Sequence, residues 1–117
     1  MLEKPVFLQG LFPFEGAGLN KPRPFEPTLT YKVPADRRTQ LIYFRAGNPT
    51  AELVYVLFKR DSKPMRYFPI GAKASTHVEL AVVEDLDPGT VLDVSIAAAE
   101  GVNGSVLLDI GLVEIEA

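Results

Sequence analysis

The chain has 117 residues, no cysteine and a formal net charge of −3. This length fits one domain of the commonest size, so we expect a single domain over residues 1–117. The lack of cysteine excludes disulfides, thiolate metal sites and a cysteine nucleophile. The acidic balance argues against a nucleic-acid partner, because a domain that neutralises phosphates is usually basic.

The charges are unevenly distributed along the chain. All twelve lysines and arginines lie in residues 1–73, which also hold six acids and sum to +6, whereas residues 74–117 hold nine acids and sum to −9. Such asymmetry points to a partner or an assembly. If the cationic segment 59–73 and the acidic segment 84–87 fold to opposite poles, the molecule has a dipole suited to head-to-tail assembly. If they fold side by side, the split reflects only topology.

The first residues do not resemble a secretion signal, because Glu3, Pro5 and Gln9 interrupt the apolar stretch. No apolar run approaches the roughly 20 residues of a membrane-spanning helix. We therefore expect a soluble, cytoplasmic protein with no membrane partner.

Eight short segments carry strand patterns, which either alternate apolar and polar residues or are apolar on both faces. They cover residues 6–12, 28–33, 39–46, 52–59, 65–70, 76–83, 91–98 and 106–116. Turn residues separate them, and no window combines helical periodicity with a cap. This pattern predicts an all-β fold, a single-domain jelly-roll-like β-sandwich of about eight antiparallel strands.

Two irregularities interrupt this pattern. Residues 13–27 contain four prolines and two glycines, which predicts an ordered Pro/Gly-rich loop or arm. In the last strand, Asp109 stands at an odd position, but Glu114 and Glu116 stand at even ones. We expect all three acids to face outward, and a strand changes parity only where a residue is inserted, which predicts a bulge near Gly111.

Residues 39–46 and 52–59 are apolar on both faces. A two-sheet sandwich buries only one face of each sheet, so the arm or another subunit must cover the second face. The residues expected at this interface are Tyr43, Tyr55 and Phe58 on the strands and Phe14 and Phe25 in the arm.

A pattern around the single histidine suggests a metal site. His77 and Glu79 stand two apart on a predicted strand, where they project to one side, and Glu84 follows. With Gly71 before them, these residues resemble the first motif of the cupins, which implies metal binding by His77, Glu79 and Glu84. The pattern departs from that family, since Glu79 stands in place of a second histidine and no histidine remains for a second motif. The competing interpretation is a solvated or interface pair.

Arginines and tyrosines offer a third possibility. Arg45 and Arg66 can clamp a carboxylate or phosphate from strand positions. Tyr43, Tyr55 and Tyr67 occupy three successive predicted strands. They would form a sugar-binding platform if they shared a face, although aromatic residues of β-proteins more often fill the core.

No pattern typical of catalysis is present. The chain has no Gly-x-Ser-x-Gly motif and only one histidine to serve any nucleophile. The acids at positions 84, 85 and 87 lie in a predicted solvated turn. We expect no resident cofactor.

Four segments resemble a family of small bacterial proteins labelled as molybdopterin-oxidoreductase associated. They are Gln40–Asn48, Met65–Lys73, Val82–Leu86 and Leu108–Glu114. The resemblance implies an accessory to a larger redox partner, since the chain lacks cysteines for an iron–sulfur cluster and is too short to enclose the pterin cofactor. It assigns no functional residue.

The sequence therefore favours a non-enzymatic binding or assembly module, either homo-oligomeric or accessory to a larger protein partner. One alternative is a degenerate cupin-like metal-binding protein or enzyme. The other is a sugar- or anion-binding sandwich.

Overall fold

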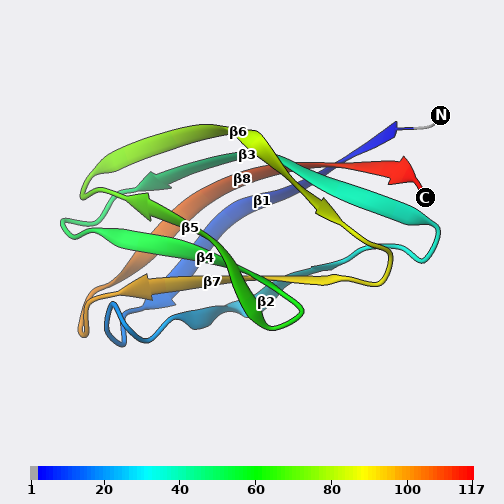
Figure 1. Ribbon diagram of the computed structural model, residues 1–117. Helices are drawn as coiled ribbons and strands as arrows, with labels where there is room; N and C mark the ends of the chain where they lie inside the picture. Colours follow the sequence, from blue (N-terminus) through cyan, green and yellow to red (C-terminus); the bar gives the residue numbers. More distant parts are fainter. Residues whose placement is uncertain (1–2) are drawn as a thin grey trace.

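A computed structural model describes residues 3–117. Its eight strands are β1 (Glu3–Glu15), β2 (Arg23–Lys32), β3 (Arg37–Asn48), β4 (Val54–Arg60), β5 (Lys63–Ile70), β6 (Ala74–Leu86), β7 (Val91–Ala98) and β8 (Asn103–Glu116). They form two four-stranded sheets that face one another (Figure 1). This part of the chain has no helix long and apolar enough to cross a membrane.

The last two strands are central strands of the two sheets. The first sheet has the order β1-β8-β3-β6 and the second has the order β2-β7-β4-β5. Every pairing is antiparallel. This insertion of late strands between early ones is the jelly-roll arrangement. The predicted all-β sandwich of eight antiparallel strands is thereby confirmed.

The core lies between the two sheets and is built within one chain. Strand alternation turns one side of each strand inward. Phe44 of β3, Phe58 of β4 and Phe68 of β5 pack together there, and the ring centroids of Phe44 and Phe68 lie 4.2 Å apart. All three side chains are buried, so both sheets contribute to a single aromatic centre.

The region predicted as a loop or arm is largely strand. β1 continues to Glu15 and β2 begins at Arg23, which leaves only residues 16–22 between them. The prolines fit because β1 and β2 are edge strands, where a missing N–H on the free side removes no ladder bond. Phe14 and Phe25 are consequently strand residues with side chains in the core.

The short loop 16–22 covers part of the outer face of the second sheet. The Gly16 and Gly18 amides donate to the backbone oxygens of Val102 and Ala98 at 2.7 and 2.8 Å. The Tyr55 hydroxyl donates to the backbone oxygen of Leu19 at 2.7 Å. A Cβ at Gly16 would lie 2.1 Å from a backbone oxygen, so this approach requires glycine. The outer face of the first sheet has no such cover from the described chain.

The irregularity predicted in the last strand lies in its neighbour. β8 pairs with β1 without a register shift along the whole of β1, so a bulge in β8 near Gly111 is wrong. β3 carries the extra residue, Ile42, between two positions that face consecutive residues of β8. The bulge leaves Phe44 on the inner face and Tyr43 on the outer face.

Glu114 faces the interior, which explains the change of parity along β8. It is buried and accepts a hydrogen bond from the Tyr31 hydroxyl of β2. The same hydroxyl lies 2.9 Å from Thr39 Oγ1 of β3. A buried carboxyl group is tolerated when it has such partners, and this one joins the two sheets.

The oppositely charged halves of the sequence lie side by side. Three of the four ion pairs in residues 3–117 join a cation of the first half to an acid of the second: Arg38–Asp85, Arg45–Asp109 and Arg66–Glu84. Arg60 also donates to the backbone oxygen of Asp85 at 2.9 Å. The cationic and acidic segments are therefore neighbours, which excludes the dipole suited to head-to-tail assembly.

Candidate functional site

The outer face of the first sheet carries a line of polar side chains from all four strands. Gln9 of β1 faces Asp109 of β8, which faces Arg45 of β3. Arg45 in turn faces His77 of β6. Residues that face one another across antiparallel strands project to the same side of the sheet. We call Gln9, Asp109, Arg45 and His77 the polar row.

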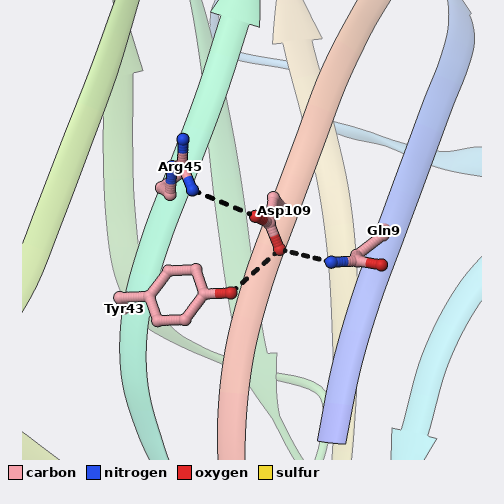
Figure 2. Close-up of polar contacts among 4 residues, drawn as sticks. All are labelled: Gln9, Tyr43, Arg45 and Asp109. Carbon is pink, nitrogen blue, oxygen red and sulfur yellow. Dashed lines mark hydrogen bonds and ion pairs between the residues drawn. The ribbon is translucent and has the colours of Figure 1, made fainter.

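Asp109 contacts two members of the polar row, Gln9 and Arg45, and also Tyr43, as Figure 2 shows. Its Oδ1 accepts hydrogen bonds from Gln9 Nε2 at 2.9 Å and from the Tyr43 hydroxyl at 3.0 Å. Its Oδ2 lies 3.5 Å from Arg45 Nη1. The bond from Gln9, helped by Tyr43 and the charge of Arg45, holds the pKa of Asp109 below its ordinary value against the opposing effect of burial. Asp109 is therefore ionised and offsets the charge of Arg45.

Tyr43 reaches Asp109 because its ring lies across β8. A Cβ at Gly111 would lie only 2.0 Å from the Tyr43 ring, so the ring occupies the space of the missing side chain. Burial, and then the bond to Asp109, raise the pKa of the Tyr43 phenol. The ring also meets His77 edge-on, with centroids 6.1 Å apart. Tyr43 is thus fixed beside the polar row.

A hollow of about 600 Å³ lies along the polar row. All four residues of the row line it, together with Ser75 and Leu107. Leu107 is 56% exposed, and it faces Leu11 of β1 on the same side of the sheet. Fixed polar groups beside an apolar surface are typical of sites for small molecules.

A second hollow, of about 440 Å³, lies where β1 ends and β2 begins. The charged side chains among its lining residues are Glu15, Arg23 and Glu26. All three are exposed. This hollow therefore lacks a fixed polar centre like that at Asp109.

The residues predicted at a subunit interface lie in three different places. Phe14, Phe25 and Phe58 are buried in the core of a single chain, so this part of the prediction is wrong. Their positions along the strands turn them inward, where they cannot meet a second subunit. Tyr43 lies on the outer face of the first sheet, and Tyr55 lies on the outer face of the second.

The predicted metal ligands do not come together. His77 and Glu79 are exposed on β6, whereas Glu84 lies beyond an irregularity of that strand and pairs with Arg66 at 2.9 Å. Residues 3–117 contain no group of three His, Cys, Asp or Glu residues that could hold a metal ion. The three predicted ligands therefore do not form one site in the described chain.

The two arginines predicted to bind an anion serve different parts of the fold. Arg45 belongs to the polar row. Arg66 donates to Glu84 through Nε at 2.9 Å and to the backbone oxygen of Val82 through Nη2 at 2.8 Å. These bonds join β5 to β6 at neighbouring edges of the two sheets. The two guanidinium groups therefore do not form one clamp.

The three tyrosines predicted as a platform divide between the two sheets. Tyr55 and Tyr67 form a pair on the outer face of the second sheet, with ring centroids 5.7 Å apart. Tyr43 lies on the outer face of the first sheet beside Asp109. A single three-ring platform is therefore not formed.

The sequence predicts no functional role for Gln9 or Asp109. Asp109 did carry a signal, because it is the only charged residue between Val106 and Val113. Gln9 carried none, since its bond to Asp109 spans 100 positions of the sequence. The pairing of the first strand with the last brings the two side chains together.

Neither a known family model nor a curated protein matches the chain. Solved structures that are similar over almost their whole length include two carbohydrate-binding modules. The CBM36-1 domain of a multidomain xylanase from the hindgut metagenome of Trinervitermes trinervoides gives a TM-score of 0.54 at 10% identity, covering 97% of this chain and 98% of that one. A family 35 carbohydrate binding module from Clostridium thermocellum gives 0.54 at 12% identity, covering 93% and 97%. This chain shares its β-sandwich fold with these two modules.

Proposed function

We propose that the chain is a non-enzymatic binding module that takes up a neutral carbohydrate on the outer face of the first sheet. The observation that carries this proposal is the polar row, held in register by four strands along a hollow of about 600 Å³. The fold shared with two carbohydrate binding modules agrees with it.

The chemistry of the polar row suits a ligand rich in hydroxyl groups. Such a ligand both donates and accepts hydrogen bonds, and Arg45 and Ser75 provide donors at the rim of the hollow. The exposed side chain of Leu107 provides an apolar surface for the C–H groups of a sugar ring. Because Gln9 and Tyr43 hold Asp109 in place before any ligand arrives, little side-chain ordering is needed on binding.

The balance of charge favours a neutral ligand over an anion. The Asp109 carboxylate lies against Arg45 and offsets its positive charge. An anion at this face would meet that carboxylate at short range. The sugar-binding interpretation of Arg45 is therefore stronger than the anion-binding one.

Titration calorimetry against a panel of neutral oligosaccharides and soluble polysaccharides tests the proposal. We expect binding to at least one neutral glycan and a loss of about tenfold or more in Arg45→Ala and in His77→Ala, as for removal of a charged or polar hydrogen-bond partner. Arg38→Ala is the matched control, because Arg38 also pairs with an acid, Asp85, but does not line the hollow. Silence across the panel, or full affinity in Arg45→Ala, contradicts the proposal.

Assembly with another protein is the second candidate function. Phe7, Leu11 and Leu107 are 52%, 64% and 56% exposed. Their register places all three on the outer face of the first sheet, beside the polar row. Exposed apolar side chains gathered on one face mark interaction surfaces in soluble proteins.

A further inference from the structure

β1 is a long free edge of the first sheet. It runs for 13 residues, and within residues 3–117 it pairs only with β8. A long edge strand offers unpaired backbone N–H and C=O groups to another strand. Such an edge therefore needs either protection or a partner.

The sequence of β1 is nearly symmetric about Gln9. Three of the four pairs at equal distances on either side, as far as the prolines, are chemically alike: Pro5 and Pro13, Val6 and Phe12, and Phe7 and Leu11, whereas Leu8 and Gly10 differ. An antiparallel pairing of two identical strands about a two-fold axis brings such positions opposite one another. This partial symmetry of β1 therefore suits pairing with a second copy of the same strand about Gln9.

We propose that β1 pairs with β1 of a second copy of this chain, antiparallel and centred on Gln9. The two first sheets then join into one eight-stranded sheet. Phe7 lies opposite the partner's Leu11, and Gln9 lies opposite the partner's Gln9. The proposal does not depend on carbohydrate binding.

The two prolines define the extent of the pairing. The ladder from β1 to β8 has no register shift, and a proline nitrogen in an edge strand belongs on the free side. Every second residue of an antiparallel strand directs its N–H group to the same side. Between Pro5 and Pro13, the residues that direct their N–H groups to the free side are therefore Phe7, Gln9 and Leu11. Pairing about Gln9 uses these three donors on each strand and stops at the prolines.

The side chains of the paired region complement one another. Exposed Phe7 and Leu11 form two apolar cross-strand pairs, which stabilise antiparallel strands. The Gln9 amide donates to Asp109 through Nε2, and its carbonyl oxygen can accept from the partner's Gln9. Two amides related by a two-fold axis each offer a donor and an acceptor.

The size of the contact predicts a weak dimer. Each of the four half-exposed apolar side chains offers roughly 100 Å². With the backbone between the prolines, the buried area stays below the roughly 1,200 Å² of stable complexes. Glu3 also lies opposite the partner's Glu15, and like charges that face one another weaken the pairing. We therefore expect dimers to form only at high protein concentration.

Single-cysteine variants test the register, because the chain has no cysteine of its own. In Gln9→Cys the two thiols face one another at the axis, where the Cα atoms of this hydrogen-bonded pair are roughly 5.5 Å apart and a disulfide can form. In Phe7→Cys or Leu11→Cys alone, the equivalent thiols are four positions out of register, roughly 14 Å apart. A mixture of these two variants brings unlike thiols opposite one another.

Under mild oxidation we expect Gln9→Cys to form covalent dimers at least tenfold faster than Phe7→Cys or Leu11→Cys alone. The mixture of the last two should yield the heterodimer, identified by mass. Equal rates for all three single variants, or no heterodimer in the mixture, would overturn the proposal. These residues are exposed or at the surface of an edge strand, and thermal unfolding of each variant checks that it folds.

Sedimentation equilibrium of the cysteine-free chain provides an independent readout. Leu11→Lys should weaken association about tenfold, since it removes two apolar pairs per dimer. Glu3→Lys should strengthen it, because a cation then faces the partner's Glu15. Tyr67→Lys, on the other sheet, is the control and should not change association. If the wild-type chain stays monomeric at about 1 mM, the proposed pairing of β1 strands is wrong, whatever the glycan titration shows.

Discussion

Asn48, at the end of β3, organises the turn that follows it. Its side chain is 2% exposed. Nδ2 donates to the backbone oxygens of Glu52, Ile70 and Gly71 at 2.8–3.2 Å. Oδ1 accepts from the amide and the hydroxyl of Thr50 at 3.0 and 2.7 Å. The side-chain amide of Asn48 thus makes the hydrogen bonds that hold the turn after β3 in place.

Replacing Asn48 with aspartate should therefore destabilise the fold. Asn48→Asp removes the donor and places a carboxylate against three carbonyl oxygens, which we expect to cost about 3 kcal/mol of the free energy of unfolding. Urea denaturation measures the change. Asn20→Asp makes the same chemical change at an exposed position and should alter stability by less than about 0.5 kcal/mol. Equal effects of the two substitutions would refute the structural role of Asn48.

Because of Tyr31, the free energy of unfolding should change with pH in the alkaline range. Burial, and then the hydrogen bond to Glu114, raise the pKa of Tyr31 to about 12. An unfolded tyrosine loses its proton near pH 10. The folded state therefore binds the proton more tightly, so this contribution is complete below about pH 10 and is lost as pH rises through about 12.

Comparison of Tyr31→Phe with the wild-type chain isolates this contribution. The substitution removes the partner of a buried carboxyl group, and we expect it to lower the free energy of unfolding by about 1–3 kcal/mol at pH 8. The difference between the two proteins should shrink between pH 10 and pH 12 in urea denaturation. Tyr67→Phe changes an exposed tyrosine and should retain the wild-type profile. A difference that stays constant across this pH range argues against the interaction.

The contacts of individual residues could not be predicted from the sequence where the partner is distant along the chain. The sequence predicts an outward Glu114 and a bulge, because an inward acid is unusual unless it has a partner. The partner, Tyr31, lies 83 positions away. Likewise, Asp109 could be placed on a strand, but not beside Gln9. Such partners depend on strand order, which local pattern does not determine.

At the scale of the strand, Tyr43 and Gly111 form a unit across β3 and β8. The ring fills the space above the glycine, and such aromatic cover of a strand glycine compensates for its missing side chain. Gly111→Ala should cost about 1–3 kcal/mol, because the new methyl group displaces the ring. In a Tyr43→Ala background the same substitution should cost little, since the obstacle is gone. Chemical denaturation of the four proteins gives this double-mutant cycle, and additive effects would contradict the contact.

The elements themselves were largely predictable. Each of the eight predicted segments overlaps one of the eight strands, because period-two alternation reports directly on a half-buried strand. The error over residues 13–27 arose from treating proline as a strand breaker. At an edge a proline nitrogen faces the free side, so β1 and β2 run on through Pro13 and Pro24. Edge position is a property of the sheet, and the sequence alone does not reveal it.

At the scale of the whole molecule, the uneven distribution of charge along the sequence follows from the strand order, which places late acidic strands beside earlier basic ones. The ion pairs Arg38–Asp85, Arg45–Asp109 and Arg66–Glu84 each join the two halves of the sequence. All three are partly exposed, so each contributes little to stability. One of them, Arg45–Asp109, lies in the hollow of the first sheet. Because the charges of Arg45 and Asp109 offset one another, this pair adds little net charge to the hollow.

The central position of β7 and β8 bears on how the chain is made. During synthesis, β1 and β3 emerge long before β8, which lies between them in the first sheet. Likewise, β2 and β4 emerge before β7, which lies between them in the second sheet. Neither sheet can close until residues 91–116 are available. Pairings this distant in sequence slow folding and leave apolar strand edges exposed in the meantime. The segment made first, residues 1–73, carries a net charge of +6, and the acidic strands that complete both sheets offset it.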